Sequence, residues 1–227
     1  MLGVFTFVFG QIFQAKWGGA SSSTSATSNL DFAAALFVGL LLYNFLAECL
    51  SKAPYLVTNQ PNYVKKIVFP LELLAVVTLL AALFHFLIAY AIVLVLVALS
   101  GWQLTAMALY TPVVILPFFL MILGITWGLS ALGVYLRDIG QIISPALTAL
   151  MFLSPIFYPL SSVSPNFLQL YQLNPLTFVV EQSRQVLLFG RAPDWSAWLP
   201  YTLISLLIAY AGYIFFQKNR QGFSDVI

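Results

Sequence analysis

The sequence predicts an all-α integral membrane protein, a bundle of six membrane spans in which the first span is incomplete. Three observations lead to this fold class. Only 7% of the 227 residues are charged and 61% are hydrophobic, whereas a soluble domain carries about 25% charged residues. The apolar residues form stretches long enough to cross a bilayer. Because an open sheet leaves backbone groups unpaired in lipid, these stretches are predicted to be helices.

The composition also excludes several classes of protein. A chain this apolar is neither a soluble globular domain, nor a disordered chain, nor a coiled coil. Its single cysteine, Cys49, cannot form an internal disulfide, so a secreted disulfide scaffold is excluded as well. The net charge of +2 gives no reason to expect a nucleic-acid partner. We therefore treat residues 1–227 as one transmembrane domain.

Each predicted span is a stretch of roughly 20 or more residues with few or no charges. The uncharged run 139–180 is too long for one helix, and the polar turn 161–166 divides it. The complete spans are expected at about residues 31–50, 70–99, 107–135, 139–160 and 195–217.

The first 15 residues are apolar but too few for a complete span. At 1.5 Å per residue, a helix over residues 1–15 is shorter than a bilayer core of about 30 Å. No basic residue precedes Lys16 and no cleavage site is clear, unlike a signal peptide. We interpret residues 1–15 as the outer half of a first span whose inner half is missing from this sequence.

The basic residues indicate the orientation of the bundle. Six spans place both ends of the chain on one side, and cations are more frequent in cytoplasmic loops. One side collects Lys52, Lys65, Lys66, Arg137, Lys218 and Arg220, and the other collects Lys16, Arg184 and Arg191. The first side is therefore predicted to be cytoplasmic.

Two cytoplasmic connections stand out. Residues 51–69 form the longer one, and a short helix is expected after each of its breakers, Pro54 and Pro61. It is either a loop made basic by its location or a docking element for a cytosolic partner. In the short turn after the fourth span, Arg137 and Asp138 are adjacent, and an interfacial anchor explains them on physical grounds alone.

The external segment before the last span predicts a helical hairpin. Asn174 as a cap and Pro175 at the first helical position predict a helix over Leu176–Phe189, ending at Gly190. Glu181 and Arg184 share a face and can pair. The helix is too hydrophobic for a free loop and too short and charged to span. This favours a re-entrant hairpin covered by protein, with an amphipathic helix lying on the membrane surface as the alternative.

No catalytic or metal-binding pattern is present in the sequence. It contains no HExxH, CxxC, GxxxxGK[ST] or GxSxG, and its carboxylates are dispersed. Two ionisable residues, Glu48 and His85, lie inside predicted spans away from the first residues of the span. Glu48 is interpreted as snorkelling to the interface, or as a conduit or helix-contact residue. His85 is interpreted either as a group hydrogen-bonded between helices or as a functional group, and the sequence shows no obvious partner for it. Gly124 and Gly128 form a weak motif for close helix packing.

Aromatic residues are abundant, at 16% of the chain. Phe5, Phe9 and Phe13 repeat every four residues and share a helix face, and Phe152 and Tyr158 lie in the outer half of the fifth span. Such residues commonly face lipid or the membrane interface. The alternative is a conduit in which aromatic rings stack on sugars.

With these motifs the sequence resembles the ABC-2 type permeases, and more narrowly those that export polysaccharides such as O-antigen, teichoic acid or polyol phosphate polymers. The resemblance covers essentially the whole chain. It rests on FTFVFG at 5–10, NQPNYVKKIVFP at 59–70, YLRDI at 135–139, and NPLT at 174–177 followed by Glu181 and Arg184. Members of this family usually begin with a cytoplasmic amphipathic helix and a full first span, and both are absent from this sequence.

The resemblance implies a permease subunit without enzymatic activity of its own. Two copies would pair around a conduit for a lipid-linked glycan in the bacterial cytoplasmic (inner) membrane, in contact with membrane lipid. Each copy would dock a separate ATPase, which binds ATP and Mg²⁺, through a coupling helix in the loop at about 51–66. The implied docking residues are Tyr55, Asn62, Tyr63, Lys65 and Lys66.

Further roles follow from the same resemblance. Arg137 and Asp138 would lie near the ATPase or the lipid head group, and Pro175, Glu181 and Arg184 would belong to an external gate. The implied conduit aromatics are Phe5, Phe9, Phe13, Phe152 and Tyr158. The competing interpretations are an ABC-2 permease for drugs or other lipids and an integral-membrane enzyme of glycolipid metabolism.

Overall fold

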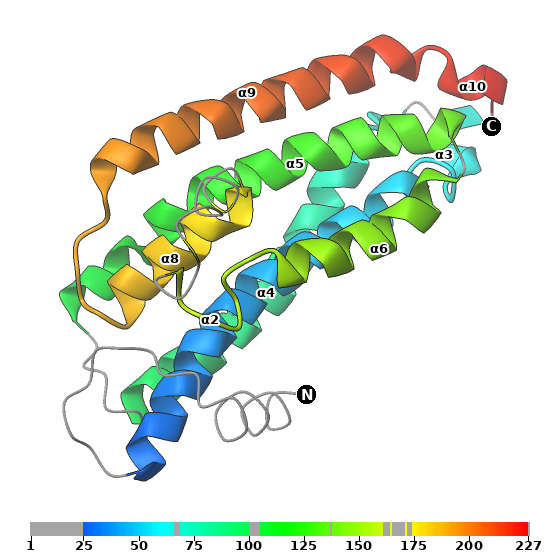
Figure 1. Cartoon of the computed structure of the whole chain (residues 1–227). Helices are drawn as coiled ribbons and strands as arrows, with labels where there is room; N and C mark the ends of the chain where they lie inside the picture. Colours follow the sequence, from blue (N-terminus) through cyan, green and yellow to red (C-terminus); the bar gives the residue numbers. More distant parts are fainter. Residues whose placement is uncertain are drawn as a thin grey trace. The chain divides into compact units, whose positions relative to one another are not determined.

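The computed structural model describes residues 25–65, 69–99, 105–136, 138–160, 164, 171 and 174–226. These residues form helices and turns, with no strand among them, so the all-α prediction is confirmed for the described part of the chain. The four long helices are α2 (Ser25–Lys52), α4 (Leu73–Leu99), α5 (Thr111–Tyr135) and α9 (Trp195–Arg220) (Figure 1). The shorter helices are η2 (Ala53–Tyr55), α3 (Pro61–Lys65), η3 (Ala106–Tyr110), α6 (Ile139–Phe152), α8 (Pro175–Leu187) and α10 (Phe223–Val226).

Four helical segments are long and apolar enough to cross a membrane. They are Phe32–Tyr55, Leu73–Ala98, Ala106–Tyr135 and Trp195–Arg220. Each begins within three residues of a predicted span. Asp31, Glu72 and Asp194 immediately precede or bound three of these starts. The predicted first span, residues 1–15, lies outside the described residues, so the six-span topology stays a prediction.

The helix of the fifth predicted span is shorter than expected. We expected about residues 139–160, but α6 ends at Phe152 after 14 residues, which is about 21 Å of helix. Pro155 disfavours helical geometry at the residue before it, and the Ser154 hydroxyl donates to the Leu150 carbonyl at 2.6 Å. The chain leaves the helix before Pro155.

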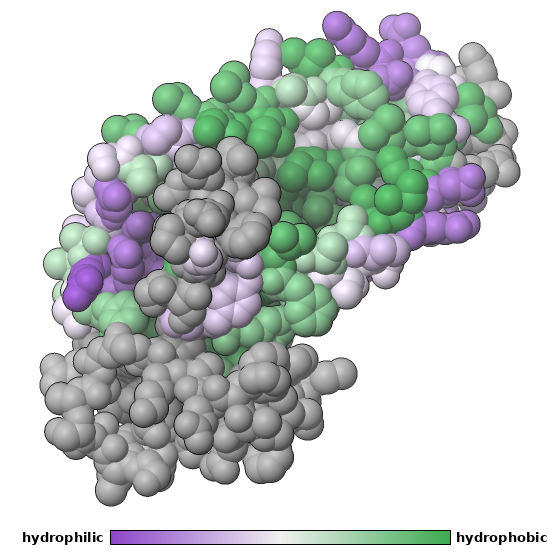
Figure 2. Space-filling model, in the orientation of Figure 1, coloured by the Kyte–Doolittle hydropathy of each residue, from purple (hydrophilic) through white to green (hydrophobic). Residues whose placement is uncertain are grey.

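The described residues group into two compact units, each built from segments that are distant in the sequence. Unit 1 comprises the described residues of Met1–Tyr43, Phe86–Ile115 and Leu150–Asp194. Unit 2 comprises those of Asn44–His85, Leu116–Ala149 and Trp195–Ile227. On the face seen in Figure 2, hydrophobic residues cover much of the described surface, and hydrophilic residues gather where α9 and α10 meet. This distribution fits helices that cross a membrane and end in water.

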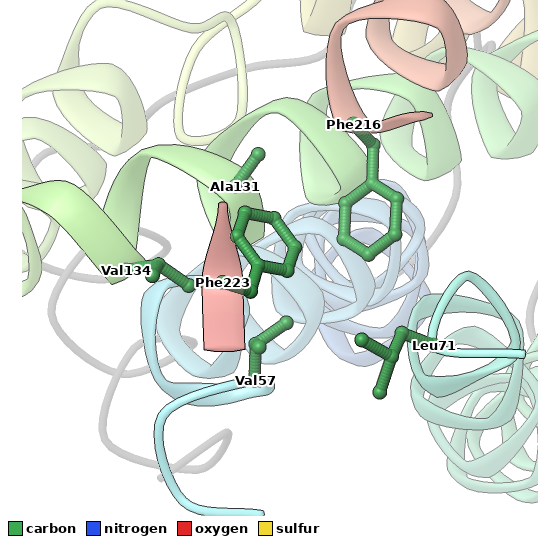
Figure 3. Close-up of a cluster of buried hydrophobic side chains, with 6 residues drawn as sticks. All are labelled: Val57, Leu71, Ala131, Val134, Phe216 and Phe223. Atoms are coloured by element: carbon green, nitrogen blue, oxygen red, sulfur yellow. The ribbon is translucent and has the colours of Figure 1, made fainter. Parts of the chain in front are cut away.

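The core of unit 2 lies at one set of helix ends. These are the ends that carry most of the charges predicted to be cytoplasmic. Its buried side chains come from the connection after α2, the start of α4, and from α5, α9 and α10: Val57, Leu71, Ala131, Val134, Phe216 and Phe223 (Figure 3). Around it, the Trp127 indole donates to the Glu72 carbonyl at 2.9 Å, and Arg220 pairs with the Glu72 carboxylate at 3.0 Å. The connection after α2 is therefore part of the folded core.

Helices α5 and α9 approach closely within unit 2, and glycines make the approach possible. A Cβ atom added at Gly124 would lie 2.5 Å from the Ala209 backbone. One added at Gly212 would overlap the Gly124 carbonyl. A Cβ at Gly128 would meet nothing within 4 Å. Only the first glycine of the predicted motif therefore serves this contact.

Gly124→Ala is expected to destabilise the protein, and Gly128→Ala is the matched control on the same helix. The added methyl group at residue 124 must push two backbones apart, and overpacking of this kind costs about 1–3 kcal/mol. At residue 128 the methyl group has room and alanine favours the helix, so the change is expected to be neutral or stabilising. Thermal unfolding in detergent measures both, and equal melting temperatures for the two variants would contradict the packing.

Candidate functional site

Helix α8 in unit 1 begins as its sequence predicts. The Asn174 side chain accepts the Leu176 backbone N–H at 3.0 Å, and Pro175 occupies the first helical position. The side-chain amide nitrogen of Asn174 also donates to the Ser154 hydroxyl at 2.8 Å and to the Leu153 carbonyl at 3.1 Å. Asn174 thus caps α8 and fixes its start to the turn after α6. At the other end, Gly190 adopts a positive φ of 59°, as a residue ending a helix often does.

Arg184 is the centre of this part of unit 1. Its side chain is fully buried, and its guanidinium donates to three backbone carbonyls. Nε reaches Ala35 on α2 at 2.9 Å, Nη1 reaches Pro155 at 2.5 Å and Nη2 reaches Ile156 at 2.8 Å. One side chain therefore ties α8 to α2 and to the turn after α6.

The predicted pairing of Glu181 with Arg184 is confirmed, but it is the weaker part of the arrangement. Glu181 Oε1 lies 3.4 Å from Arg184 Nη1, farther than the three carbonyl oxygens. Burial lowers the pKa of Arg184 to about 10 and Glu181 opposes this shift, so the guanidinium remains protonated at neutral pH. Burial raises the pKa of Glu181, and Arg184 counteracts part of that shift. The geometry thus places a buried cation on carbonyl dipoles.

Gly39 on α2 leaves room for the guanidinium because it has no side chain. A Cβ atom added at Gly39 would lie 2.9 Å from Arg184 Nη2. Within the helix itself, nine residues of α8 are buried, including polar Thr177, Gln182 and Ser183. This cover is what the re-entrant interpretation requires, and it disfavours a helix lying freely on a membrane surface. The membrane position of α8 stays a prediction.

Two of the predicted conduit aromatics come together in unit 1. The Tyr158 hydroxyl lies 2.6 Å from that of Tyr171 and donates to the Phe152 carbonyl at 2.9 Å. Phe152 is 59% exposed, and its ring centroid is 6.1 Å from that of Phe157. Phe152 is thus largely exposed, whereas the Tyr158 hydroxyl is hydrogen-bonded. Phe5, Phe9 and Phe13 lie outside the described residues.

Unit 2 carries the predicted docking residues in two different environments. Tyr55 and Asn62 are exposed, with Tyr55 at 42%. Tyr63 is half-buried against the core of unit 2, with its ring 4.9 Å from Phe69. Lys65 ends α3, and Lys66 lies outside the described residues. In the turn after α5, Asp138 is exposed and Arg137 lies outside the described residues.

A cavity of about 380 Å³ opens beside these residues in unit 2. The exposed Tyr55 ring forms part of its wall, and Gly133 packs directly on the Pro54 backbone. The lining residues are Pro54, Tyr55, Thr58, Pro61, Gly133, Val134 and Val226. The cavity is thus built from the connection after α2, the end of α5 and the end of α10, and it adjoins the predicted docking residue Tyr55.

No partner for His85 is evident in the sequence, and the structure supplies one. His85 Nδ1 lies 3.0 Å from both carboxylate oxygens of Glu48, and Lys52 Nζ lies 2.7 Å from one of them. The Glu48–Lys52 pair follows from its spacing of four residues on one helix. The contact between Glu48 and His85 joins residues 37 positions apart, which no local pattern could have indicated.

Comparison with known proteins decides the family. The sequence pattern of the ABC-2 type transporters matches residues 1–188. The chain belongs to the ABC-2 type transporter family. With four helices long enough to span, this ABC-2 chain is a multi-pass membrane protein.

The relatives of this ABC-2 chain include proteins with a named transport role. It is 26% identical over 195 residues to the O-antigen export system permease protein RfbA of Myxococcus xanthus, covering 85% of this chain and 75% of the relative. It is 20% identical over 199 residues to a protein of the same name from Klebsiella pneumoniae, covering 85% and 74% of the two chains. The chain is similar to these permeases over most of its length.

Arg184→Gln is expected to destabilise this ABC-2 chain strongly, and Arg191→Gln is the matched control. Removing the guanidinium leaves three buried carbonyls without their donor, which costs at least about 2 kcal/mol. Arg184→Lys is expected to recover only part of this, because an ammonium lacks the planar fork. Arg191 is exposed, and its substitution should stay within about 0.5 kcal/mol. Thermal unfolding in detergent compares them, and an Arg184→Gln variant as stable as Arg191→Gln would refute the role of the guanidinium.

Proposed function

We propose that this chain is the transmembrane permease subunit of an ABC exporter that moves a lipid-linked polysaccharide across the bacterial cytoplasmic membrane. The observation that carries the proposal is the similarity to O-antigen export permeases over 85% of the chain. The polymer is of the O-antigen or teichoic-acid kind, attached to a lipid carrier. A second copy of the chain completes the conduit.

A separate cytosolic ATPase supplies the energy in this proposal. ATP and Mg²⁺ bind to that subunit, which docks on the exposed residues around Tyr55 and Asn62 in unit 2. The support is physical: the connection that carries these residues is held rigidly, because Val57 is buried in the core. A movement imposed on a rigid connection is transmitted to α5 and α9, which share that core. A flexible loop would absorb it.

Helix α8 is the external gate in this proposal, with Arg184 and Glu181 as its anchors. A gate must be held in one position and yet be able to leave it. Arg184 holds α8 in the observed position by donating hydrogen bonds to three backbone carbonyls. Thr177 and Ser183 carry buried hydroxyl oxygens that have no hydrogen-bond partner within the described part of the chain. Because such groups cost free energy in the packed position, they reduce the preference of α8 for that position.

Deleting the gene that encodes this chain is expected to remove the polysaccharide from the cell surface while the lipid-linked polymer accumulates inside. In this proposal the chain only moves the lipid-linked polymer, so loss of the permease blocks transport and not synthesis. Immunoblots of intact cells and of spheroplasts measure the two pools. Cells that keep their surface polysaccharide and become sensitive to drugs would contradict the proposal and favour a drug exporter.

Asn62→Arg is expected to weaken co-purification of the ATPase, and Gln221→Arg is the matched control. Both are exposed amides, but only Asn62 lies on α3 in the predicted docking connection. A bulky cation in the centre of a protein interface typically costs 1 kcal/mol or more, about a fivefold loss of affinity. Deleting the connection would be a poorer test, because it removes Val57 from the core. Equal ATPase recovery with both variants would refute docking at α3.

A further inference from the structure

Three ionisable side chains in unit 2 meet in a cluster that the proposed transport role does not use. Glu48 and Lys52 lie one turn apart on α2, and His85 lies on α4. Lys52 Nζ is 2.7 Å from Glu48 Oε1. His85 Nδ1 is 3.0 Å from the same oxygen and 3.0 Å from Oε2. The carboxylate therefore holds both nitrogen groups in place.

The nitrogen groups form the outer part of this cluster. The side-chain exposure is 23% for Glu48, 51% for Lys52 and 63% for His85. The ammonium has three N–H donors, of which Glu48 takes one. On the imidazole, Nδ1 faces Glu48, and Nε2 has no hydrogen-bond partner among the described residues. The cluster thus turns the remaining ammonium N–H groups of Lys52 and the second imidazole nitrogen of His85 outward, and it keeps its negative charge inside.

The surface around the cluster is apolar. On the part of α4 that belongs to unit 2, the exposed large side chains are Leu73, Val77, Leu80 and Phe84. His85 is the one exposed polar residue of α4 among its described side chains. Charged groups facing hydrocarbon are costly, and a polar ligand on this face would reduce that cost. An apolar surface with the Lys52 ammonium at one place fits a molecule with both an anionic group and hydrocarbon chains.

The position of Lys52 along α2 matches the depth of lipid head groups. The apolar segment ends at Tyr55, so Lys52 lies about 4.5 Å from its end along the helix axis. This end carries the cations of the predicted cytoplasmic side. Lysine side chains commonly extend from such a position to the membrane interface. The phosphate groups of the lipids lie at that interface.

We propose that Lys52 and His85, held by Glu48, bind the phosphate group of a membrane lipid whose hydrocarbon chains lie along the exposed apolar side chains of α4. Lys52 donates to the phosphate with its remaining N–H groups, and His85 donates from Nε2 when the ring is protonated. Two sources share this chemistry: a glycerophospholipid and a polyprenyl phosphate. The site does not depend on which substrate the chain exports.

Native mass spectrometry of the full chain in detergent, titrated with phosphatidylglycerol, tests this site. Lys52→Gln and His85→Gln are each expected to weaken binding about fivefold to tenfold, as the loss of one charge-assisted hydrogen bond does. Lys52→Arg is expected to retain binding. The matched control is Lys218→Gln, because Lys218 is also an exposed lysine in the last turn of a spanning helix. Diacylglycerol lacks the phosphate. Its affinity for the wild-type chain is therefore expected to be about as low as the affinity of phosphatidylglycerol for Lys52→Gln or His85→Gln.

The outcomes separate the possibilities. Polyprenyl phosphate that binds more tightly than phosphatidylglycerol assigns the site to a lipid carrier, and the reverse order assigns it to bulk phospholipid. Equal binding by wild type and Lys52→Gln would overturn the proposal and leave the cluster as a contact between α2 and α4. Diacylglycerol or inorganic phosphate binding as well as phosphatidylglycerol would also overturn it. If His85→Gln fails to fold, Lys52→Gln alone decides, since the Lys52 side chain is half-exposed.

Discussion

The buried guanidinium of Arg184 is the interaction on which the arrangement of unit 1 depends. A cation with no exposed surface is costly unless every donor finds an acceptor. Here the acceptors are backbone carbonyls of α2 and of the turn after α6, with Glu181 as a more distant partner. Those three elements must therefore stay together while the charge is buried. The position of α8 is fixed less by its apolar face than by this requirement.

Unit 2 meets the same physical demand in a different way. Just before the start of α4, Arg220 pairs with the Glu72 carboxylate and Trp127 donates to the Glu72 carbonyl. The buried cluster around Phe216 and Phe223 then joins the connection after α2 to the ends of α5 and α9. Rigid packing suits a surface that receives force from a partner, as the proposed docking of an ATPase requires. In the cluster of Glu48, Lys52 and His85, the remaining N–H donors of Lys52 point outward, which suits a lipid phosphate.

Local features were predictable from the sequence, and contacts between distant residues were not. Charges mark the ends of the spans, and Asn174–Pro175 marks the start of α8, because both signals act within one turn of helix. The acceptors of Arg184 include Ala35, 149 positions away, and only the fold brings them together. Gly124 and Gly128 look equivalent in the sequence, yet only Gly124 contacts α9. The fifth span was predicted too long as a helix because hydropathy does not register the effect of Pro155.

Hydrogen–deuterium exchange of the backbone amides in α8 tests the central claim most directly. The comparison is between the wild type, Arg184→Gln and Arg191→Gln in the same detergent. If Arg184 holds α8 in place, the amides of residues 176–187 exchange slowly in the wild type and in Arg191→Gln. In Arg184→Gln they exchange at least about tenfold faster, because local opening no longer has to break the carbonyl contacts. Unchanged protection of α8 in Arg184→Gln would contradict the account.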